Sequence, residues 1–408
     1  MHRRDRFLFQ KGQGDTTLCR MKVGIVGASG AGLYAALLLS YAHPDYEIHL
    51  FDQNKIIGKK LLATGNGHCN LLPSKLDCNA FSNPKEFNRL SHGISLEVLK
   101  DKLESLGVSL EQVNNLYYPT SYHAPTHVRF LEKSLENKGV VFHLDTKILD
   151  YQKQGKLWVL PTEKSDFCMD FVIFAPGGLS QSKLGSDGSL VQTFKNHGYA
   201  ISPLHPGLAP IQTKESVKAL SGIRHASNCS LVVNGKKVAE ESGEVLFKKD
   251  GLSGICIFNL ESVYVRHYLN DKCEIHLDLF PAMSEEKLTL LLEKNRNLSG
   301  EDYLYPLLVK QLQDYIIFGA KRLYGNDNCG SIARILKDLT FHISGHYPFE
   351  ESQVTVGGIQ LHQVDDHFQS KLEQGIFLIG ECLDMDGLCG GNNLAWCLIG
   401  ALKVCEAI

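Results

Sequence analysis

Several common kinds of site are missing from this sequence of 408 residues. None of its twelve cysteines forms a C-x-x-C pair, and their scattered spacing fits neither a zinc site nor the disulfide framework of a secreted protein. A reducing compartment, the cytoplasm, is therefore expected. No apolar run reaches membrane-spanning length. The formal net charge of −3 gives no general affinity for polyanions, although it leaves a local basic face open.

The first twenty residues lack the apolar central region that a secretory signal needs, because they are polar and basic. Met21 stands directly before the first expected strand. We interpret 1–20 as a disordered extension that results from an upstream start codon, with contact to nucleic acid as the alternative. No internal repeat or low-complexity linker is evident, and the chain length suggests two or three domains.

What the sequence does contain is an apolar strand that runs through a glycine-rich turn into an apolar helix, over 22–39. The turn carries Gly27, Gly30 and Gly32, but Ser29 stands where the dinucleotide fingerprint has its second glycine. The first N–H groups of the helix and the helix dipole together favour a pyrophosphate at this turn. A turn of small residues can also serve only to pack a helix on a sheet.

An acidic residue follows this strand, turn and helix at a spacing that is typical of nucleotide-binding βαβ units. A second strand, 47–51, ends in Asp52, twenty residues after Gly32. At that distance a βαβ unit brings a carboxylate to the ribose hydroxyls of adenosine. Asp52 alone could be an ordinary turn residue, but strand, turn, helix, strand and acid together favour nucleotide binding.

A second glycine-rich loop, GKKLLATGNGHCN, covers 58–70. It is not a Walker A loop, because no Ser or Thr follows the lysine and the upstream glycine is not at the right distance. Lys59 and Lys60 form a basic pair that could equally lie on a solvated surface. Since the loop begins so soon after Asp52, we expect it to lie near the same nucleotide.

This loop resembles that of the BaiN/RdsA-type family of bacterial FAD-dependent oxidoreductases, which reads G-x-K-x-x-x-(S/T)-G-x-G-R-C-N. His68 replaces the arginine here. Other segments resemble the family as well: APGG at 175–178, GEVLFKKDGLSG at 243–254, TVGGI at 355–359 and GECLDMDGLCGGNNLAW at 380–396. The chain departs from the family pattern at Ser29, His68, Pro176 and Asn392, which marks a divergent member whose substrate can differ.

The resemblance implies an α/β fold with a discontinuous, Rossmann-like FAD-binding domain. An inserted β-rich, barrel-like domain carries a small helical subdomain. Strand-like runs around an Asn234-Gly235 turn and a helical pattern that begins at Ser284 are compatible with this order. We expect the FAD-binding domain at 21–205 and 357–408, the β-rich domain at 206–280 with a return strand at 341–356, and the helical subdomain at 281–340.

FAD is thus the predicted cofactor, and segments from the N-terminal and the C-terminal parts of the chain would contact it. By analogy with flavoproteins of this fold, Glu381 lies near the ribityl or phosphate region. The helix after Gly391 presents its N-terminus to the flavin and stabilises the anionic reduced form, although this segment is also a common structural N-cap. The predicted FAD contacts are Gly27, Ser29, Gly30, Ala31, Gly32, Asp52, Gln53, Lys60, Thr64, Gly65, Asn66, Gly67, Cys69, Asn70, Ile148, Gly177, Gly178, Gly380, Glu381, Gly391, Asn392, Asn393 and Leu394.

Catalysis would need a proton donor beside the flavin. A hydride that leaves flavin N5 for an electron-poor carbon leaves a neighbouring carbon to be protonated by Cys, Tyr or His. Cys69 and His68 are the candidates, although buried structural cysteines and solvent-facing histidines are more common. Tyrosines and a histidine in 114–127 form a second set: Tyr117, Tyr118, Tyr122 and His123. No metal is predicted, because Pro125 interrupts the helix that the spacing from His123 to His127 would need.

The sequence therefore predicts an FAD-dependent reductase of an activated C=C bond. NAD(P)H is the implied electron source, and it would bind transiently because no second G-x-G-x-x-G follows a strand. The implied substrates are small unsaturated rings, such as keto-steroids, or uridine in ribosomal RNA, which would become dihydrouridine. The net negative charge favours the small substrate, whereas the lysine pairs 236–237 and 248–249 leave RNA as an alternative substrate. A non-catalytic, flavin-binding regulatory protein is a further alternative. No membrane contact is expected, and no oligomeric state is indicated.

Overall fold

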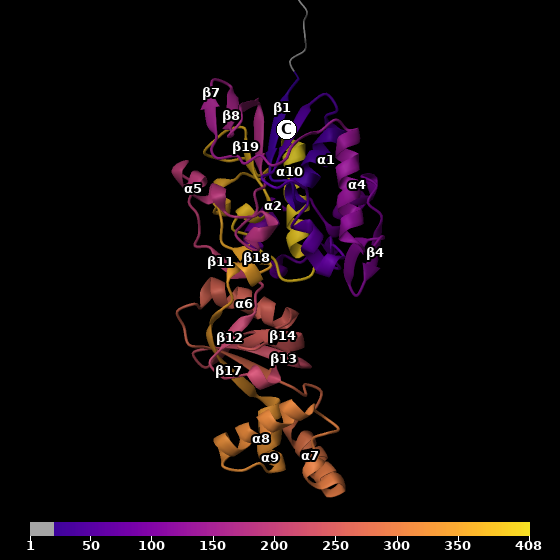
Figure 1. The fold of residues 1–408 in the computed structure, drawn as a ribbon, viewed down its shortest axis with the longest axis vertical. Helices are drawn as coiled ribbons and strands as arrows, with labels where there is room; N and C mark the ends of the chain where they lie inside the picture. Colours follow the sequence, from indigo (N-terminus) through magenta and orange to yellow (C-terminus); the bar gives the residue numbers. More distant parts are fainter. Residues whose placement is uncertain (1–19) are drawn as a thin grey trace, which may run out of the picture.

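The computed structural model describes residues 20–408, so the extension expected at 1–20 lies outside the described residues apart from its last position. Three bodies follow one another along the long axis of the molecule (Figure 1). The Rossmann-like domain at one end holds both the indigo start and the yellow end of the chain. The barrel lies in the middle, and the three helices α7, α8 and α9 lie at the far end.

A parallel five-stranded sheet forms the centre of the Rossmann-like domain. Its strands lie in the order β19-β10-β1-β2-β6. They are β1 (Lys22–Val26), β2 (Glu47–Phe51), β6 (Val141–His143), β10 (Phe171–Phe174) and β19 (Ile376–Leu378). Strand β1 is buried from Val23 to Val26 because both faces of the sheet are covered. The helix that follows β1 lies on the Ile25 side, and Leu160 and Met169 of a small antiparallel sheet lie on the Gly24 side. Since β19 comes from the far end of the chain and pairs with β10, the predicted discontinuous domain is confirmed.

Helix α1 (Gly30–Ala42) is buried from Gly30 to Ser40, as expected of a helix that is apolar all round. It packs against α10 (Asn392–Ala407) and α4 (Ala124–Asn137). The other helices of the domain are α2 (Pro84–Leu90), α3 (Leu96–Ser105) and α5 (Ser189–Asn196). Two small antiparallel sheets complete it: β3 (Leu72–Pro73), β5 (Leu116–Pro119) and β4 (Leu110–Val113), and β7 (Gln152–Gln154), β8 (Leu157–Pro161) and β9 (Asp166–Met169).

The inserted domain is a closed six-stranded barrel in the order β12-β15-β14-β13-β16-β17. Closure leaves no exposed strand edge, and alternate residues of β13 and β16 fill the interior. The strands are β12 (Ile211–Thr213), β13 (Arg224–Val233), β14 (Lys236–Phe247), β15 (Gly251–Ser253), β16 (Cys273–Asp278) and β17 (Leu339–His346). The barrel-like insertion predicted from the resemblance is confirmed.

The barrel joins the Rossmann-like domain through a two-stranded sheet, β11 (His205–Gly207) with β18 (Val354–Val356). Helix α6 (Ile255–His267) lies between this sheet and the barrel strands (Figure 1). Helix α6 therefore lies at the junction of the barrel and the Rossmann-like domain.

The helical subdomain is inserted between β16 and β17. It consists of α7 (Glu285–Ser299), α8 (Lys310–Tyr324) and α9 (Cys329–Lys337). Ser284 caps α7, as the sequence predicts, because its hydroxyl accepts a hydrogen bond from the Lys287 N–H at 3.3 Å. Among residues 20–408, no helix is both long enough and apolar enough to cross a membrane.

Candidate functional site

A cavity of about 900 Å³ lies between the Rossmann-like domain and the barrel. On one side it is lined by the glycine turn, the 58–70 loop and the start of α10. On the other it is lined by β13, β14 and the start of α6. A smaller cavity of about 70 Å³ adjoins it beyond the ends of β1 and β2. The two cavities share the lining residues Gly27, Asp52, Pro176, Gly177, Gly185 and Glu381.

Most of the predicted FAD contacts meet at these cavities. The large cavity is lined by Gly27, Ser29, Gly30, Ala31, Asp52, Lys60, Thr64, Gly65, Asn66, Asn70, Gly177, Gly380, Glu381, Gly391, Asn393 and Leu394. Gln53, Ile148 and Gly178 line the small one. Four predicted contacts line neither: Gly32, Gly67, Cys69 and Asn392.

The glycine turn is shaped by close backbone packing. Gly27 has a φ of +110°, and a Cβ there would lie 2.1 Å from the Ala175 carbonyl oxygen. A Cβ on Gly32 would lie 1.8 Å from the Gly27 oxygen, so Gly32 lets α1 start directly against the turn. Ser29 is the N-cap residue and makes no capping bond with its side chain. The start of α1 therefore presents backbone N–H groups to the cavity, as a phosphate site requires.

Asp52 ties the end of β2 to this turn. One carboxylate oxygen accepts a hydrogen bond from the Ala28 N–H at 2.7 Å, and the other accepts from the Asn54 N–H at 2.8 Å and its amide group at 2.9 Å. Each carboxylate oxygen has two acceptor sites, so a ribose hydroxyl can still donate to Asp52.

The segment 185–187 closes one side of the small cavity. The Gln53 amide donates to the Gly185 carbonyl at 2.5 Å, and Lys147 forms an ion pair with Asp187 at 3.0 Å. Burial alone would raise the pKa of Asp187, but hydrogen bonds from Ser189 and Lys147 lower it to about 2. The carboxylate therefore stays charged and holds the segment in place.

The 58–70 loop contains an unusual run of left-handed backbone. Gly65 and Asn66 have φ of 55° and 53° inside η1 (Leu61–Gly67), and Cys69 has a φ of 62°. Such conformations are strained for residues other than glycine and concentrate at ligand sites. The loop thereby turns Thr64, Asn66 and Asn70 to the cavity.

The structure separates the two predicted catalytic residues. Cys69 is completely buried and does not line the cavity, and burial raises the pKa of its thiol to about 11. His68 does line the cavity. Its Nδ1 lies 2.9 Å from the Tyr122 carbonyl, and its ring stacks on that of Tyr122 with centroids 4.0 Å apart. Since a carbonyl only accepts, Nδ1 carries the proton in this contact.

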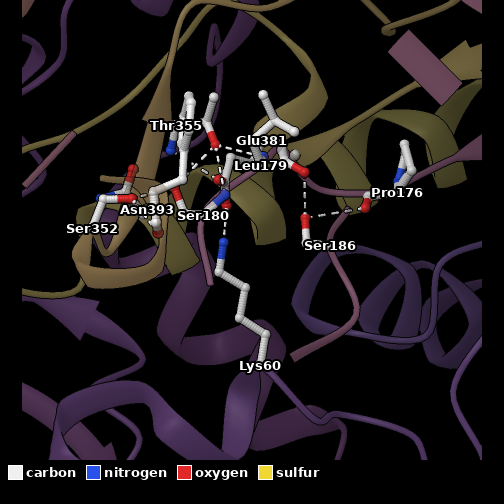
Figure 2. Close-up of polar contacts among 12 residues, drawn as sticks. Lys60, Pro176, Leu179, Ser180, Ser186, Ser352, Thr355, Glu381 and Asn393 are labelled. Atoms are coloured by element: carbon white, nitrogen blue, oxygen red, sulfur yellow. Dashed lines mark hydrogen bonds and ion pairs between the residues drawn. The ribbon is translucent and has the colours of Figure 1, made fainter. Parts of the chain in front are cut away.

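An ion pair joins the two ends of the chain inside the cavity. Lys60 Nζ lies 2.6 Å from Glu381, and their side chains are only 20% and 18% exposed. The second carboxylate oxygen of Glu381 accepts from the Thr355 N–H at 2.9 Å (Figure 2). Because Thr355 lies on β18, the pair connects the 58–70 loop, the end of β19 and the link to the barrel.

The turn after β10 packs against the same network (Figure 2). The Thr355 hydroxyl accepts from the Leu179 N–H at 2.7 Å and from the Ser180 N–H at 3.2 Å. A Cβ on Gly178 would lie 2.3 Å from this hydroxyl, so only glycine allows the approach. Ser186 donates to the Gly178 carbonyl at 2.7 Å and fixes the other side of the turn.

The start of α10 reaches the cavity through Gly390, Gly391 and Asn393. Gly391 is left-handed at φ 85°, and a Cβ there would lie 2.5 Å from the backbone of Leu72. The Asn393 side chain bridges Gly387, accepting from its N–H at 2.9 Å and donating to its carbonyl at 2.7 Å. Asn392 is instead buried, and its amide donates to the Leu388 carbonyl at 3.0 Å.

Sequence reasoning missed the residues on the barrel side of the cavity. These are Arg224, Ser242, Gly243, Glu244, Leu246, Ser253, Gly254, Ile255 and Phe258. Cys389 also lines the cavity; burial raises the pKa of its thiol to about 12, and its N–H donates to Asn259 on α6 at 3.0 Å. The only sequence signal for this wall was the GEVLFKKDGLSG segment, which fitted the family without indicating a contact.

These residues fit the FAD that the resemblance implies. The turn at Gly27 has no room for a side chain, backbone N–H groups point to one place, and Asp52 lies between two joined cavities. The candidate site therefore combines a dinucleotide cradle with a second wall supplied by the barrel.

Comparison with known proteins shows which proteins the chain is similar to. The chain is 27% identical to a 3-dehydro-bile acid delta(4,6)-reductase of Clostridium scindens over 396 residues, which cover 92% of this chain and 96% of that protein. It is 23% identical to the ribosomal RNA dihydrouridine synthase of Escherichia coli, over 91% of this chain and 94% of that protein. A solved flavocytochrome c3 fumarate reductase in an open conformation is 14% identical, with a TM-score of 0.49, and the alignment covers 95% of this chain and 78% of that one.

The family match is more extensive than any single motif. Residues 21–407 match the HI0933-like protein Rossmann domain, which is nearly the whole described chain. The chain therefore belongs to the HI0933-like family, as its resemblance to the BaiN/RdsA-type FAD-dependent oxidoreductases predicted.

Proposed function

We propose that this flavoprotein reduces an activated C=C bond in a small cyclic substrate, with NAD(P)H as a transient electron donor. The observation that carries the proposal is the cavity itself. It joins a dinucleotide cradle to a wall of barrel side chains, so a second molecule has room beside the cofactor. The name of the Clostridium scindens relative, a reductase of a small molecule, supports the same reading.

The cradle would hold FAD from both ends of the chain. We assign the adenine to the small cavity beside Gln53 and Ile148, and the ribose to Asp52. The pyrophosphate belongs at the start of α1, and the flavin ring at the start of α10. When bound, FAD would accept a hydride from the donor and pass it to the substrate carbon.

His68 is the protein group that we assign to proton transfer. Its Nδ1–H donates to the Tyr122 carbonyl, so a proton for the substrate would come from the Nε2–H of the doubly protonated imidazolium, with Nδ1–H still bound to the carbonyl. Cys69 is less suited, because its thiol is buried beneath the loop. The stacked Tyr122 ring restricts rotation of the imidazole and keeps Nε2 in one orientation.

The alternative substrate, uridine in ribosomal RNA, is supported by the Escherichia coli relative. The charge of the insertion favours the small substrate instead. Residues 206–347 contain seventeen Lys or Arg and seventeen Asp or Glu, so this part of the chain has no excess positive charge for phosphates. Two lysines of its basic pairs are also neutralised, since Lys237 pairs with Glu240 and Lys248 pairs with Glu351.

The first test is the visible spectrum of protein purified without added flavin. Flavin absorbance is expected, and a colourless protein that takes up no FAD would overturn the cofactor assignment. Anaerobic mixing with NADH and with NADPH then tests the donor, because one of them should bleach the flavin. If neither donor does so, the NAD(P)H-dependent scheme fails and a non-catalytic role gains support.

The second test uses the reduced protein and two kinds of acceptor. Androst-4-ene-3,17-dione, a neutral cyclic enone, should reoxidise the flavin, whereas ribosomal RNA should not. Reoxidation by RNA alone, together with salt-dependent RNA binding, would replace the small-substrate proposal with the RNA alternative.

A further inference from the structure

Three rings line the Rossmann side of the large cavity and contact one another: His68, Tyr118 and Tyr122, here called the aromatic shelf. We propose that the aromatic shelf binds the ring of the substrate by stacking, and that the part of the substrate which enters is flat and uncharged. This inference rests on the proposed function and names the substrate-binding surface of the same site.

Contacts among the three residues fix the shape of the shelf. The rings of His68 and Tyr122 are nearly parallel, at 16°, with centroids 4.0 Å apart, and Tyr118 meets Tyr122 edge-on at 4.8 Å. Tyr122 has a φ of 49°, a strained conformation for a bulky residue. Its N–H donates to the Pro119 carbonyl at 2.7 Å, and its own carbonyl accepts from His68. The fold thus maintains strain in order to hold a 38% exposed tyrosine ring at the cavity.

Part of the barrel wall of the same cavity is apolar. Leu246 on β14 and Ile255 and Phe258 on α6 line it. Ile255 is 64% exposed, although it stands at the start of a helix that is otherwise mostly buried. Exposed apolar side chains that line a cavity with aromatic rings are typical of a site for an apolar ligand. A flat ring can therefore contact the shelf on one face and these side chains on the other.

The charges on this wall argue for an uncharged ring. Arg224 and Glu244 line the cavity and form an ion pair with each other at 2.5 Å. Both side chains are more than half exposed, and each neutralises the other. An anionic group that entered here would meet the Glu244 carboxylate as well as the Arg224 guanidinium, so the pair gives no net attraction for it.

Strand β5, which carries Tyr118 of the shelf, offers a matched control. Tyr117 and Tyr118 are neighbours on β5, and successive side chains of a strand point to opposite faces. Leu116 and Tyr118 line the cavity, but Tyr117 does not. The ring of Tyr117 instead lies beneath the Lys100 ammonium, 4.9 Å from the ring centroid. Substitution of Tyr117 or of Tyr118 by alanine removes a tyrosine ring from the same strand, but only the substitution of Tyr118 affects the shelf.

The experiment titrates oxidised, FAD-loaded protein with androst-4-ene-3,17-dione and follows the flavin absorbance. Tyr118→Ala and Tyr122→Ala should each raise the Kd about tenfold, since each removes an aromatic ring of the shelf. Tyr117→Ala should stay within about twofold, because its ring does not line the cavity. Flavin content and Tm of each variant establish that the protein is folded and loaded, and Tyr122→Phe should bind like the unaltered chain because it keeps the ring.

Uridine 5′-monophosphate, a flat ring that carries phosphate, serves as the charged probe and should bind more weakly than the enone. The proposal is overturned if Tyr117→Ala weakens binding as much as Tyr118→Ala, or if both shelf variants bind like the unaltered chain. It is also overturned if the enone does not perturb the flavin or if the charged probe binds more tightly. Flavin reduction by NADH or NADPH in the same variants is read separately, so its failure would implicate the proposed function rather than the shelf.

Discussion

The two walls of the cavity are made in different ways. The cradle consists of backbone: at Gly27, Gly178 and Gly391 a Cβ would lie within 2.5 Å of another atom. The barrel wall consists of side chains from separate segments, and some of them, such as Ile255, are largely exposed. A wall of exposed side chains can change without disturbing the fold, whereas a wall of packed backbone cannot. We therefore expect the stability of the fold to determine which residues the cradle can have. The residues of the barrel wall should instead be determined by the substrate.

The largest expected effect comes from adding a methyl group to the cradle. Gly27→Ala combines a φ of +110° with a Cβ 2.1 Å from the Ala175 oxygen, so the strand end at β10 would have to move. Strain and overpacking together should cost about 3 kcal/mol or more and abolish FAD binding. Gly67→Ala is the control, because its φ is also positive, at +87°, but nothing lies within 4 Å of the added Cβ. Its cost should be about 1 kcal/mol, as measured by urea unfolding, with flavin retained. Equal losses in both variants would show that backbone conformation, and not packing, limits the cradle.

Acidification should destabilise the Rossmann-like domain through a buried histidine. His127 on α4 is 3% exposed and contacts the hydroxyl of Tyr34 on α1 at 2.9 Å, behind the cradle. Burial lowers the pKa of His127 to about 4 from the ordinary 6.5. The unfolded chain therefore takes up a proton at higher pH than the folded one, and stability is lost as the pH falls below about 6.5.

Between about pH 7.5 and about pH 5 this one group should lower the free energy of unfolding by about 2 kcal/mol. His127→Gln keeps a hydrogen-bonding side chain but does not titrate, so its stability should depend less on pH over this range. Urea unfolding at the two pH values measures the difference, and flavin fluorescence reports release from the cradle. The assignment is wrong if the variant loses as much stability on acidification as the unaltered chain.

Two ion pairs, one on each wall, allow a direct comparison of burial. Lys60 and Glu381 are about four-fifths buried, so Lys60→Met would leave the carboxylate without its cation in a confined site. The expected cost in FAD affinity is about 1 to 3 kcal/mol, or about tenfold to hundredfold in Kd. Reconstitution of the apoprotein with FAD measures it. The double variant Lys60→Met with Glu381→Gln should recover part of the loss, because no uncompensated charge remains.

The cradle could be predicted from the sequence because close packing of the backbone requires particular residue types, and these can be recognised in the sequence. A turn without space for a Cβ requires glycine, as at Gly27, and the acid predicted at the end of the second strand, Asp52, binds the Ala28 N–H of that turn. The barrel wall could not be found in this way, because Arg224, Leu246 and Ile255 meet only after the chain has folded. Their residue types are also ordinary for a strand or a helix.

The cysteines show the limit of local reasoning. Cys69 stands inside the second loop, so its position in the sequence indicates a place near the flavin. Its left-handed backbone turns the chain beneath the loop, and the side chain is completely buried. Cys389 stands in the 380–396 segment that resembles the family, but the resemblance did not indicate a contact for it. It lines the cavity, and its N–H donates to Asn259 of α6. Whether a side chain reaches a cavity depends on backbone dihedrals that spacing alone does not reveal.

The smallest effect should come from the ion pair on the barrel wall. Arg224 and Glu244 are 60% and 56% exposed, and such pairs contribute little because water screens them and ordering the side chains costs entropy. Arg224→Ala should change the free energy of unfolding by at most about 0.5 kcal/mol and leave the affinity for FAD unchanged. Its effect should instead be on the choice of ligand, since it leaves Glu244 alone on the wall and makes an anionic probe bind still more weakly. A loss of FAD affinity comparable to that of Lys60→Met would mean that the barrel wall helps to hold the cofactor, and the division between the two walls would then be wrong.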